Sequence, residues 1–237
     1  MQFAFTIMPP KSKKLVKRKK PTRNTRGSFF VHKTAEIEKG VQIGQNVKIW
    51  SLTQIRKGAK IGENTIIGRN CFIDHEVEIG KNSKVQNNAS IYYQAFLAEG
   101  VFIGPHVCLA NDKLPRAITP NGKIKGQDDW QISTIKIKKG AAIGAHSVIL
   151  PGVTIGQFAL VGSGSVVTKG VPDFALVYGN PARLRGFVCF CGKRLKNFSL
   201  NKNQLVSVCD CGKQISIPED VFRQKEEEKA KKRVWIR

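Results

Sequence analysis

An aliphatic residue recurs at every sixth position over most of the chain, and this period restricts the possible folds more than any other feature. Two runs carry it, the first being Ile37, Ile43, Ile49, Ile55, Ile61, Ile67, Ile73, Ile79, Val85, Ile91, Leu97, Ile103 and Leu109, and the second Ile137, Ile143, Ile149, Ile155, Val161 and Val167. An amphipathic helix needs apolar spacings of three and four residues, whereas an antiparallel strand alternates and then turns at irregular intervals. The sequence fits neither pattern.

The fixed period predicts short strands joined by identical corners. Each aliphatic side chain points inward, and a small or β-branched residue four positions later leaves room where neighbouring faces meet. Three hexapeptides make one triangular coil, so residues eighteen apart stack at the strand spacing of about 4.8 Å. Glycine and asparagine at the bends, such as Gly44 and Asn70, tolerate the left-handed backbone conformation that tight corners need. The predicted fold is therefore all-β, a parallel β-helix with a core of stacked Ile and Val.

The period stops between Leu109 and Ile137, and the segment 110–134 is polar and contains two prolines and two glycines. A long excursion from a regular solenoid is usually either functional or disordered. Trp130 and the isoleucines near it favour an ordered loop that docks on a surface.

The eighteen-residue rule places two lines of polar side chains near this loop. His75, Tyr93 and Asn111 fall at the same place on three successive coils, so the loop leaves the helix above Tyr93 and His75. A second line runs through Asn70, Asn88 and His106. Asparagine ladders stabilise solenoid corners, and we accept that role for Asn70. Asn88 lies one coil below the loop, where a structural role and a functional one are about equally favoured.

The repeat resembles the left-handed parallel β-helix of the hexapeptide acyltransferase superfamily, from about Val31 to Phe187. The resemblance implies left-handed coils, although general rules favour right-handed crossovers. It also implies acetyl-CoA as co-substrate and a homotrimer in which the excursion loop reaches a neighbouring subunit. No apolar run approaches membrane-spanning length and the first residues make a poor secretory signal, so we expect a cytoplasmic protein.

The segment KVQNNASIYYQAFLAEGVFIGPHVCLANDKLPRAI is similar to N-acetyltransferases that acylate UDP-linked amino sugars, above all those acting on UDP-2-acetamido-3-amino-2,3-dideoxyglucuronate. Those enzymes carry a similar QNN run and an FTN…PR segment, where this chain has LANDKLPRA with Ala110 at the usual Thr. The resemblance implies that Asn87 or Asn88 holds the sugar near its amine. It also implies that Asn111 and Arg116 bind the acceptor, in the synthesis of surface polysaccharide such as lipopolysaccharide.

The segment VVTKGVPDFALVYGNPAR resembles the end of the repeat in that superfamily, where the adenosine and phosphates of CoA bind. By this resemblance Lys169 and Arg183 are candidates for the CoA phosphates. The pantetheine arm is expected to run along the backbone near Gly144, Ala145 and Gly162, where small residues permit close approach.

Many O-acetylating relatives use a histidine at the start of the excursion loop, where this chain has Asn111 and Asp112. An amine needs less activation than a hydroxyl, and the departing CoA thiolate can take its proton, so we predict N-acetylation. If a side-chain base exists, His75 is the better candidate and His106 the second, because an imidazole has a suitable intrinsic pKa. Asn88 completes the predicted catalytic set.

Acetyl transfer also needs a group that stabilises the tetrahedral oxyanion. We expect backbone N–H groups near Gly104 or Gly144 to do so.

Four of the six cysteines form two close pairs, Cys189 with Cys191 and Cys209 with Cys211. Four thiolates suit a closed, structural zinc site, although C-x-C is tighter than the usual C-x-x-C spacing. Disulfides are the rival interpretation, and a cytoplasmic setting disfavours them. A module this short has little core of its own, which is a reason to need a metal.

We therefore divide the chain into four parts: a basic, disordered tail (1–28), the β-helix (29–187), a zinc ribbon (188–217) and a short, basic helical tail (218–237). A large share of the net charge of +23 lies in the N-terminal tail, and a second basic cluster, 229–237, closes the chain. Like-charged runs are usually solvated tails, and no aromatic residues alternate with these charges to stack on bases. Nucleic acid is thus a possible partner only through the tails.

Alternative functions stay open on the same fold. One is an O-acetyltransferase, and another is a non-enzymatic scaffold whose basic tails bind nucleic acid. A γ-carbonic anhydrase needs three convergent histidines, which the spacings of His32, His75, His106 and His146 do not provide. The acceptor sugar stays open as well, since a dTDP-linked amino hexose would share much of the loop pattern.

Overall fold

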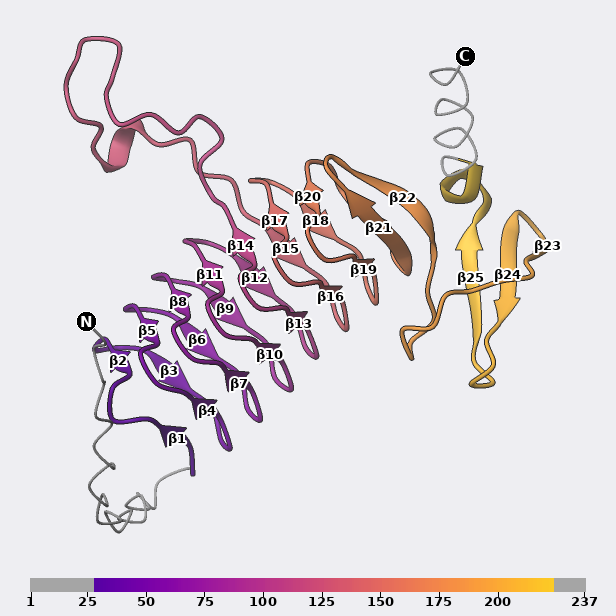
Figure 1. Ribbon diagram of the computed structural model, residues 1–237, viewed down its shortest axis with the longest axis horizontal. Helices are drawn as coiled ribbons and strands as arrows, with labels where there is room; N and C mark the ends of the chain where they lie inside the picture. Colours follow the sequence, from indigo (N-terminus) through magenta and orange to yellow (C-terminus); the bar gives the residue numbers. More distant parts are fainter. Residues whose placement is uncertain (1–27, 224–237) are drawn as a thin grey trace, which may run out of the picture.

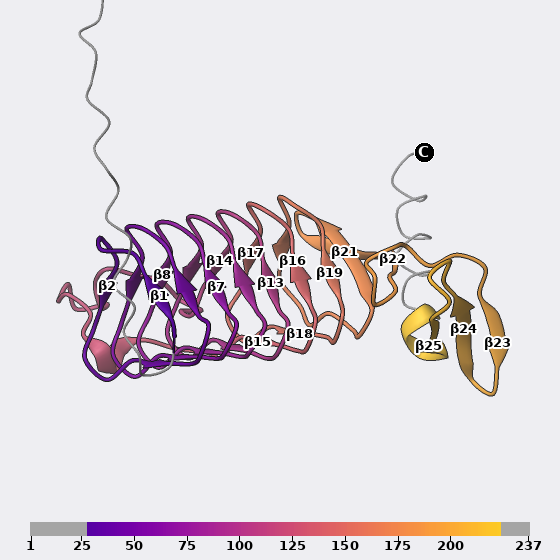
Figure 2. The same cartoon turned by 90° about the horizontal axis from the view of Figure 1, so that it is seen from below.

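The aliphatic residue of each hexapeptide ends a two-residue strand, as the period predicts. The computed structural model describes residues 28–223, and in them every predicted aliphatic position from Ile37 to Val167 is the second residue of a strand. The strands stack into three parallel sheets, which form the three faces of a left-handed β-helix (Figures 1 and 2). The predicted fold class is confirmed.

The faces differ in length because the chain enters and leaves the helix at different points. The first face contains β1 (Phe30–Val31), β4 (Lys48–Ile49), β7 (Ile66–Ile67), β10 (Lys84–Val85), β13 (Phe102–Ile103), β16 (Ala142–Ile143), β19 (Leu160–Val161), β21 (Ala175–Gly179) and β22 (Ala182–Phe187). The second contains β2 (Glu36–Ile37), β5 (Gln54–Ile55), β8 (Phe72–Ile73), β11 (Ser90–Ile91), β14 (Cys108–Leu109), β17 (Val148–Ile149) and β20 (Val166–Val167). The third contains β3 (Gln42–Ile43), β6 (Lys60–Ile61), β9 (Glu78–Ile79), β12 (Phe96–Leu97), β15 (Lys136–Ile137) and β18 (Thr154–Ile155).

Residues eighteen apart pair in register, as Ile49 does with Ile67. Across the excursion loop the register difference becomes forty, since Leu97 pairs with Ile137. The loop therefore leaves the stacking of the coils unchanged. The aliphatic residues of the inner coils are almost completely buried, and Ile103 and Ile143 have no exposed surface.

The glycines that follow the aliphatic positions have a different role from the predicted one. Gly44 and Gly104 do not adopt positive φ. A Cβ on Gly44 would instead lie 2.6 Å from the Glu63 nitrogen, and one on Gly104 would lie 2.6 Å from the Ala145 nitrogen. These glycines are required by the close approach of the next coil. The left-handed conformation falls at later corner positions, such as Asn70 with φ of 55°, so the expectation for asparagine is confirmed.

The excursion loop leaves β14 and returns to β15 as an arm that projects from the body of the helix (Figure 1). It has a 3-10 turn, η1 (Gln127–Asp129), and antiparallel bridges pair Asp112 with Ile132 and Ile118 with Ile124. The loop is thus ordered, as its composition predicts.

The last strands form a different structure. β21 and β22 make an antiparallel hairpin that continues the first face. A three-stranded sheet follows, made of β23 (Ser199–Asn201), β24 (Gln204–Val208) and β25 (Gln214–Pro218). It lies beyond the C-terminal end of the helix in both views (Figures 1 and 2). Phe187 of β22 contacts the rings of Phe198 and Phe222, so the core of this module is continuous with the helix.

The predicted tails fall largely outside the described residues. Of the two, only residue 28 and residues 218–223 are described, and residues 219–223 are helical. Among residues 28–223, no helix is long and apolar enough to cross a membrane.

Substituting Gly104 by Ala should lower the free energy of unfolding by about 1–3 kcal/mol, because the new Cβ collides with backbone of the next coil. Gly126→Ala is the matched control. Gly126 lies on the arm and does not adopt positive φ, and a Cβ there would lie 3.9 Å from an Asp129 carboxylate oxygen, which is an ordinary contact. Urea unfolding followed by circular dichroism measures both. Equal midpoints for the two variants would contradict the explanation from coil stacking.

Candidate functional site

A buried carboxylate organises the corner between β8 and β9. The Asp74 side chain accepts hydrogen bonds from Nδ1 of His75 at 2.8 Å, from the His75 backbone nitrogen at 2.7 Å and from Nη1 of Arg56 at 2.9 Å. Its second oxygen accepts a bond from the Tyr93 backbone nitrogen at 3.2 Å. Asp74 is only 7% exposed, so the carboxylate is held by partners from three successive coils.

These contacts fix the His75 imidazole. Its ring stacks on Tyr93 with centroids 4.0 Å apart and planes 11° from parallel, which confirms the predicted alignment of the two residues. An ionised carboxylate only accepts hydrogen bonds, so Nδ1 of a neutral His75 carries the proton that is shared with Asp74. Nε2 is then the basic ring atom that can exchange a proton with a ligand.

The ionisation of Asp74 reflects two opposing influences. Burial by itself raises the pKa of the carboxyl, but the hydrogen bonds and charge of His75 and the hydrogen bond from Arg56 outweigh burial. The pKa of Asp74 therefore lies below its ordinary value, and the group is an anion at neutral pH.

The second predicted line of side chains is a ladder at the next corner. The Asn70 amide donates to Oδ1 of Asn88 at 2.9 Å, and Nδ2 of Asn88 lies 3.1 Å from Nε2 of His106. His106 in turn stacks on His146, with centroids 4.6 Å apart. Both ends of the Asn88 amide are thus engaged within the ladder, which gives this residue a structural role. Its catalytic role stays a prediction.

One predicted sugar-binding residue, Asn87, adjoins this ladder, where its carbonyl accepts a bond from the His106 nitrogen at 3.1 Å, and the other two lie on the arm. Oδ1 of Asn87 accepts a hydrogen bond from the Arg69 backbone nitrogen at 2.8 Å. Asn111 is half-buried at the base of the arm, where its carbonyl accepts a bond from the Ser133 nitrogen at 3.0 Å. Arg116 is exposed further along the arm, and its guanidinium donates to the adjacent Pro115 carbonyl at 3.3 Å. Within residues 28–223, none of these three residues forms a hydrogen bond or ion pair with His75.

The expectation that the Gly104 and Gly144 N–H groups bind the oxyanion is wrong. The Gly104 nitrogen donates to the Ile143 carbonyl and the Gly144 nitrogen to the Val161 carbonyl, each at 2.8 Å. These N–H groups hold successive coils together and cannot also bind a developing oxyanion.

The predicted CoA residues lie on the last coils and the terminal hairpin. The Gly162 nitrogen also donates to the next coil, and a Cβ on Gly144 would meet the backbone of Ser163. Lys169 is exposed, while Arg183 is half-buried and donates to the Ala182 carbonyl at 3.1 Å. The small residues in this region are thus explained by coil stacking, and their contact with CoA stays a prediction.

An open groove of about 620 Å³ runs along the third face, over β3, β6, β9 and β12. Its lining includes Lys60, Glu78 and Phe96 but none of the predicted site residues. We give greater weight to the His75 corner, because it combines an oriented imidazole, a buried anion and the base of the arm.

Two family models match the sequence. One describes the GMPPB C-terminal domain and covers residues 25–129, and the other describes six repeats of the bacterial transferase hexapeptide and covers residues 134–169. The second model describes the same period of six that builds the observed coils. Residues 134–169 thus match the repeat of the bacterial hexapeptide transferases.

Curated relatives match part of the chain. Over 88 residues the chain is 51% identical to the dTDP-3-amino-3,6-dideoxy-alpha-D-galactopyranose 3-N-acetyltransferase of Aneurinibacillus thermoaerophilus, covering 37% of this chain and 43% of that protein. Over 90 residues it is 30% identical to the galactoside O-acetyltransferase of Lactococcus lactis, covering 38% and 42%. The matched stretches thus span less than half the length of either relative.

Among solved structures, the chain is similar to a hexapeptide-repeat acetyltransferase of Vibrio cholerae that was solved with acetyl coenzyme A. The identity is 24% and the TM-score 0.46, with 55% of this chain and 70% of that one covered.

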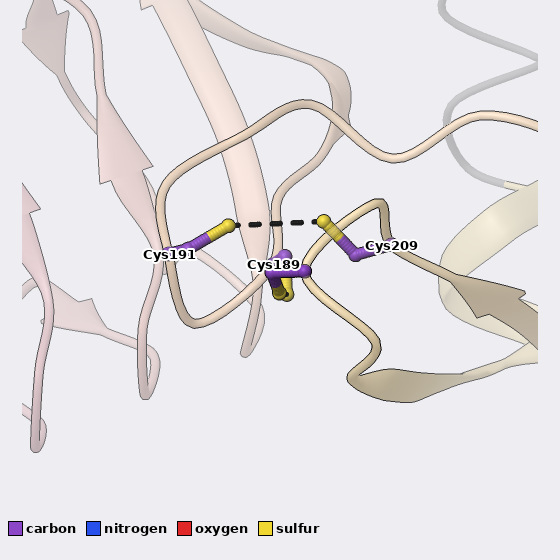
Figure 3. A group of neighbouring side chains, drawn as sticks. Cys189, Cys191 and Cys209 are labelled. Carbon is purple, nitrogen blue, oxygen red and sulfur yellow. Dashed lines mark hydrogen bonds between the residues drawn. The ribbon is translucent and has the colours of Figure 1, made fainter.

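The C-terminal module brings the four predicted cysteines together. Their sulfur atoms all lie within 4.8 Å of one another. Figure 3 shows the thiols of Cys191 and Cys209 pointing toward each other, 3.7 Å apart. Within residues 28–223, this is the one cluster of three or more cysteine, histidine or acidic side chains with a geometry suited to a metal ion. No three histidines of the described residues therefore converge on a shared metal position.

Sequence reasoning missed two members of these clusters. Asp74 directly precedes His75 at a corner, and this position could have indicated a contact between the two side chains. Its burial and its bond to Arg56 depend on how the coils stack. His146 was missed because the loop changes the register difference from eighteen to forty, the separation of His106 and His146.

Substituting Asp74 by Asn should lower the free energy of unfolding at pH 7 by about 1–3 kcal/mol, because Arg56 and His75 lose a charged acceptor. Since the folded-state pKa of Asp74 is depressed, its contribution is present above about pH 4 and is lost as the pH falls through the folded-state value. Unfolding by urea from pH 7 to pH 3 should therefore show the two proteins converging in acid.

Glu78→Gln is the control for this comparison, because Glu78 forms a solvent-exposed ion pair with Lys60 and should contribute little. A difference between wild type and Asp74→Asn that does not change with pH would contradict the proposed ionisation of Asp74.

Proposed function

We propose that the protein transfers the acetyl group of acetyl-CoA to the amino group of a nucleotide-linked amino sugar, in the synthesis of surface polysaccharide. The observation that carries this proposal is the 51% identity over 88 residues with a 3-N-acetyltransferase acting on such a sugar. The oriented imidazole at the base of the arm supports it, because amine acetylation releases a proton that needs an acceptor.

In the proposed reaction, the neutral amine forms a bond to the thioester carbon, and the carbon–sulfur bond then breaks. The CoA thiolate leaves with the electron pair. Nε2 of His75 receives the ammonium proton and passes it to the thiolate, while Asp74 stabilises the transient imidazolium. Asp74 acts through His75 and is thus a positioning residue.

The acceptor is held in this proposal by Asn87, Asn88, Asn111 and Arg116. Arg116 has the planar fork that suits a carboxylate or phosphate, and its guanidinium is exposed on the arm. The name of the Aneurinibacillus relative supports a dTDP-linked sugar, whereas the loop pattern favours a UDP-linked one. The shared chemistry is a nucleoside diphosphate joined to an amino hexose.

Acetyl-CoA is the proposed co-substrate, with its phosphates at Lys169 and Arg183 and its pantetheine arm along Gly144, Ala145 and Gly162. Lys169 is exposed and Arg183 is half-buried, and both lie near the C-terminal end of the helix. Neither has an acidic partner among the ion pairs of the described residues.

We also propose a homotrimer, in which the arm of one chain covers the site of the next. The arm carries large apolar side chains in solvent, with Leu114 58%, Ile118 53% and Trp130 48% exposed. Apolar surface of this kind on a projecting segment is typical of a contact with another chain.

Release of free CoA thiol from acetyl-CoA, screened with UDP- and dTDP-linked amino sugars, tests the reaction. We expect turnover that requires the amine. His75→Ala should lower kcat by about 10²–10⁴-fold through loss of the proton acceptor. His32→Ala is the matched control and should keep its rate, because His32 lies in the first coil and bonds Thr34.

Arg116→Ala should raise KM for the sugar about tenfold or more, since a hydrogen bond to a charged group contributes about 1.5–3 kcal/mol. Lys123→Ala removes another exposed charge of the same arm and should leave KM unchanged. Turnover with hydroxyl sugars alone would indicate an O-acetyltransferase. An absence of both turnover and CoA binding would overturn the proposal and favour the nucleic-acid-binding scaffold.

Light scattering on the purified protein should give the mass of three chains. Substituting both Leu114 and Trp130 by Ser should shift the protein toward monomers and lower turnover, because the arm loses its apolar contacts. Ile67→Val, inside the core, serves as a control for general destabilisation. A wild-type monomer that is fully active would contradict the trimer.

A further inference from the structure

We propose that Cys189, Cys191, Cys209 and Cys211 bind one structural Zn²⁺ ion, which fastens the C-terminal module to the end of the β-helix. This site takes no part in acetyl transfer, and the proposal does not depend on the proposed reaction. It rests on the positions of the four sulfur atoms, on a duplicated backbone turn and on an aromatic contact with the helix.

The sulfur positions fit a tetrahedral ion. A zinc–sulfur distance of about 2.3 Å places the corners of a regular tetrahedron about 3.8 Å apart. The sulfur atoms of Cys189 and Cys211 lie 3.5 Å apart, and those of Cys191 and Cys209 lie 3.7 Å apart. All the remaining separations are within 4.8 Å, so small movements of the side chains suffice to enclose the ion.

The first cysteine pair lies on a tight turn that ends in Cys-Gly-Lys. The Cys189 nitrogen donates to the Lys193 carbonyl at 2.9 Å, and the Gly192 nitrogen donates to the Cys189 carbonyl at 2.9 Å. Gly192 has φ of 82°, a conformation that side chains other than glycine's rarely adopt. This turn directs two thiols to one side.

The second pair repeats the same turn. The Cys209 nitrogen donates to the Lys213 carbonyl at 2.9 Å, the Gly212 nitrogen donates to the Cys209 carbonyl at 2.8 Å, and Gly212 also has φ of 82°. Two copies of one turn from distant parts of the chain face each other, and each supplies two thiols. A chance meeting of cysteines would not explain the matched backbone, whereas a shared ligand does.

The chemistry of the ligands favours zinc. Four thiolates are soft donors, and a tetrahedral set of four sulfurs is typical of zinc or iron. A closed set of four protein ligands leaves no position for water or substrate, which is the character of a structural site. Zinc is our assignment, and iron is an outcome that the experiment distinguishes.

The position of the first turn shows what the ion would join. This turn directly follows β22, the last strand of the helix, and the second turn follows β24 of the module. Phe190 lies between the first two cysteines and packs edge-on against Phe158 at 4.6 Å and Phe174 at 5.0 Å. An ion held by both turns would thus connect the module to a turn that is wedged against the last coils.

Metal analysis of the full-length protein tests the assignment directly. We expect one zinc per chain in the wild type and in the Cys108→Ser control, which removes a thiol of the helix. The Cys209→Ser/Cys211→Ser variant should contain none above background. Protein loaded with Co²⁺ should show the absorption of tetrahedral cobalt–thiolate coordination. A chain that carries iron instead would overturn the zinc assignment.

Thiol titration of the unfolded wild type, without reductant and with chelator, separates zinc from disulfides. Zinc coordination predicts that all six cysteines react. Two disulfides would leave only Cys71 and Cys108 reactive, and together with a lack of metal this result would overturn the site. Both measurements are independent of turnover, so failure of the transferase proposal leaves them interpretable.

Limited proteolysis tests the fastening role. Removing the metal from wild-type protein with a chelator should expose the module to cleavage, while the far-ultraviolet circular dichroism of the helix is retained. Phe190→Ala should keep one zinc per chain and still increase cleavage, because the contact with Phe158 and Phe174 is lost. A module that resists protease equally with and without metal would contradict this role.

Discussion

Hydrogen bonding between coils at one strand spacing is the constraint on which the structure depends. Each strand from β1 to β20 has only two residues, so none of them is stable by itself, and each coil is held by the coils before and after it. The same constraint decides which residues can stand at the corners. Gly104 is needed because the next coil approaches too closely for a Cβ, and its N–H is committed to the Ile143 carbonyl. N–H groups of this kind are committed to the neighbouring coil, so corner side chains are better placed to carry the chemistry.

Stacking also brings side chains from residues eighteen apart in the sequence together at one corner. Arg56, His75 and Tyr93 stand on three successive coils, and the Asp74 carboxylate accepts hydrogen bonds from all three. Burial of that carboxylate is tolerated because its partners compensate for lost water, and the result is a fixed imidazole at the surface. The arm leaves the helix at the same corner, one coil above Tyr93. An arm inserted there changes no strand register, so a solenoid can gain a site without loss of its core.

The sequence predicted the strands of the coils almost residue by residue, because the period of six has no gap within either run and an aliphatic residue ends each of the predicted strands. It predicted the contact between His75 and Tyr93 for the same reason. It could not predict that Asp74 would be buried, since an acidic residue beside a corner is usually solvated, and it assigned the wrong reason to the glycines after each isoleucine. It also placed Asn111 and Arg116 near the site, but the path of an irregular arm depends on contacts that no period encodes.

The end of a solenoid needs a cap, because the last coil leaves an apolar edge without a partner. Here the terminal hairpin turns antiparallel, and Phe187 at its end joins the rings of Phe198 and Phe222 from the module. That small core buries few large residues beyond Leu195, Ile215 and Ile217, and a sheet of three short strands has little stability alone. The four-cysteine cluster lies between this core and the Phe190 contact. A cross-link at that point restrains both at once, which explains why the cysteines stand at the junction and not inside the module.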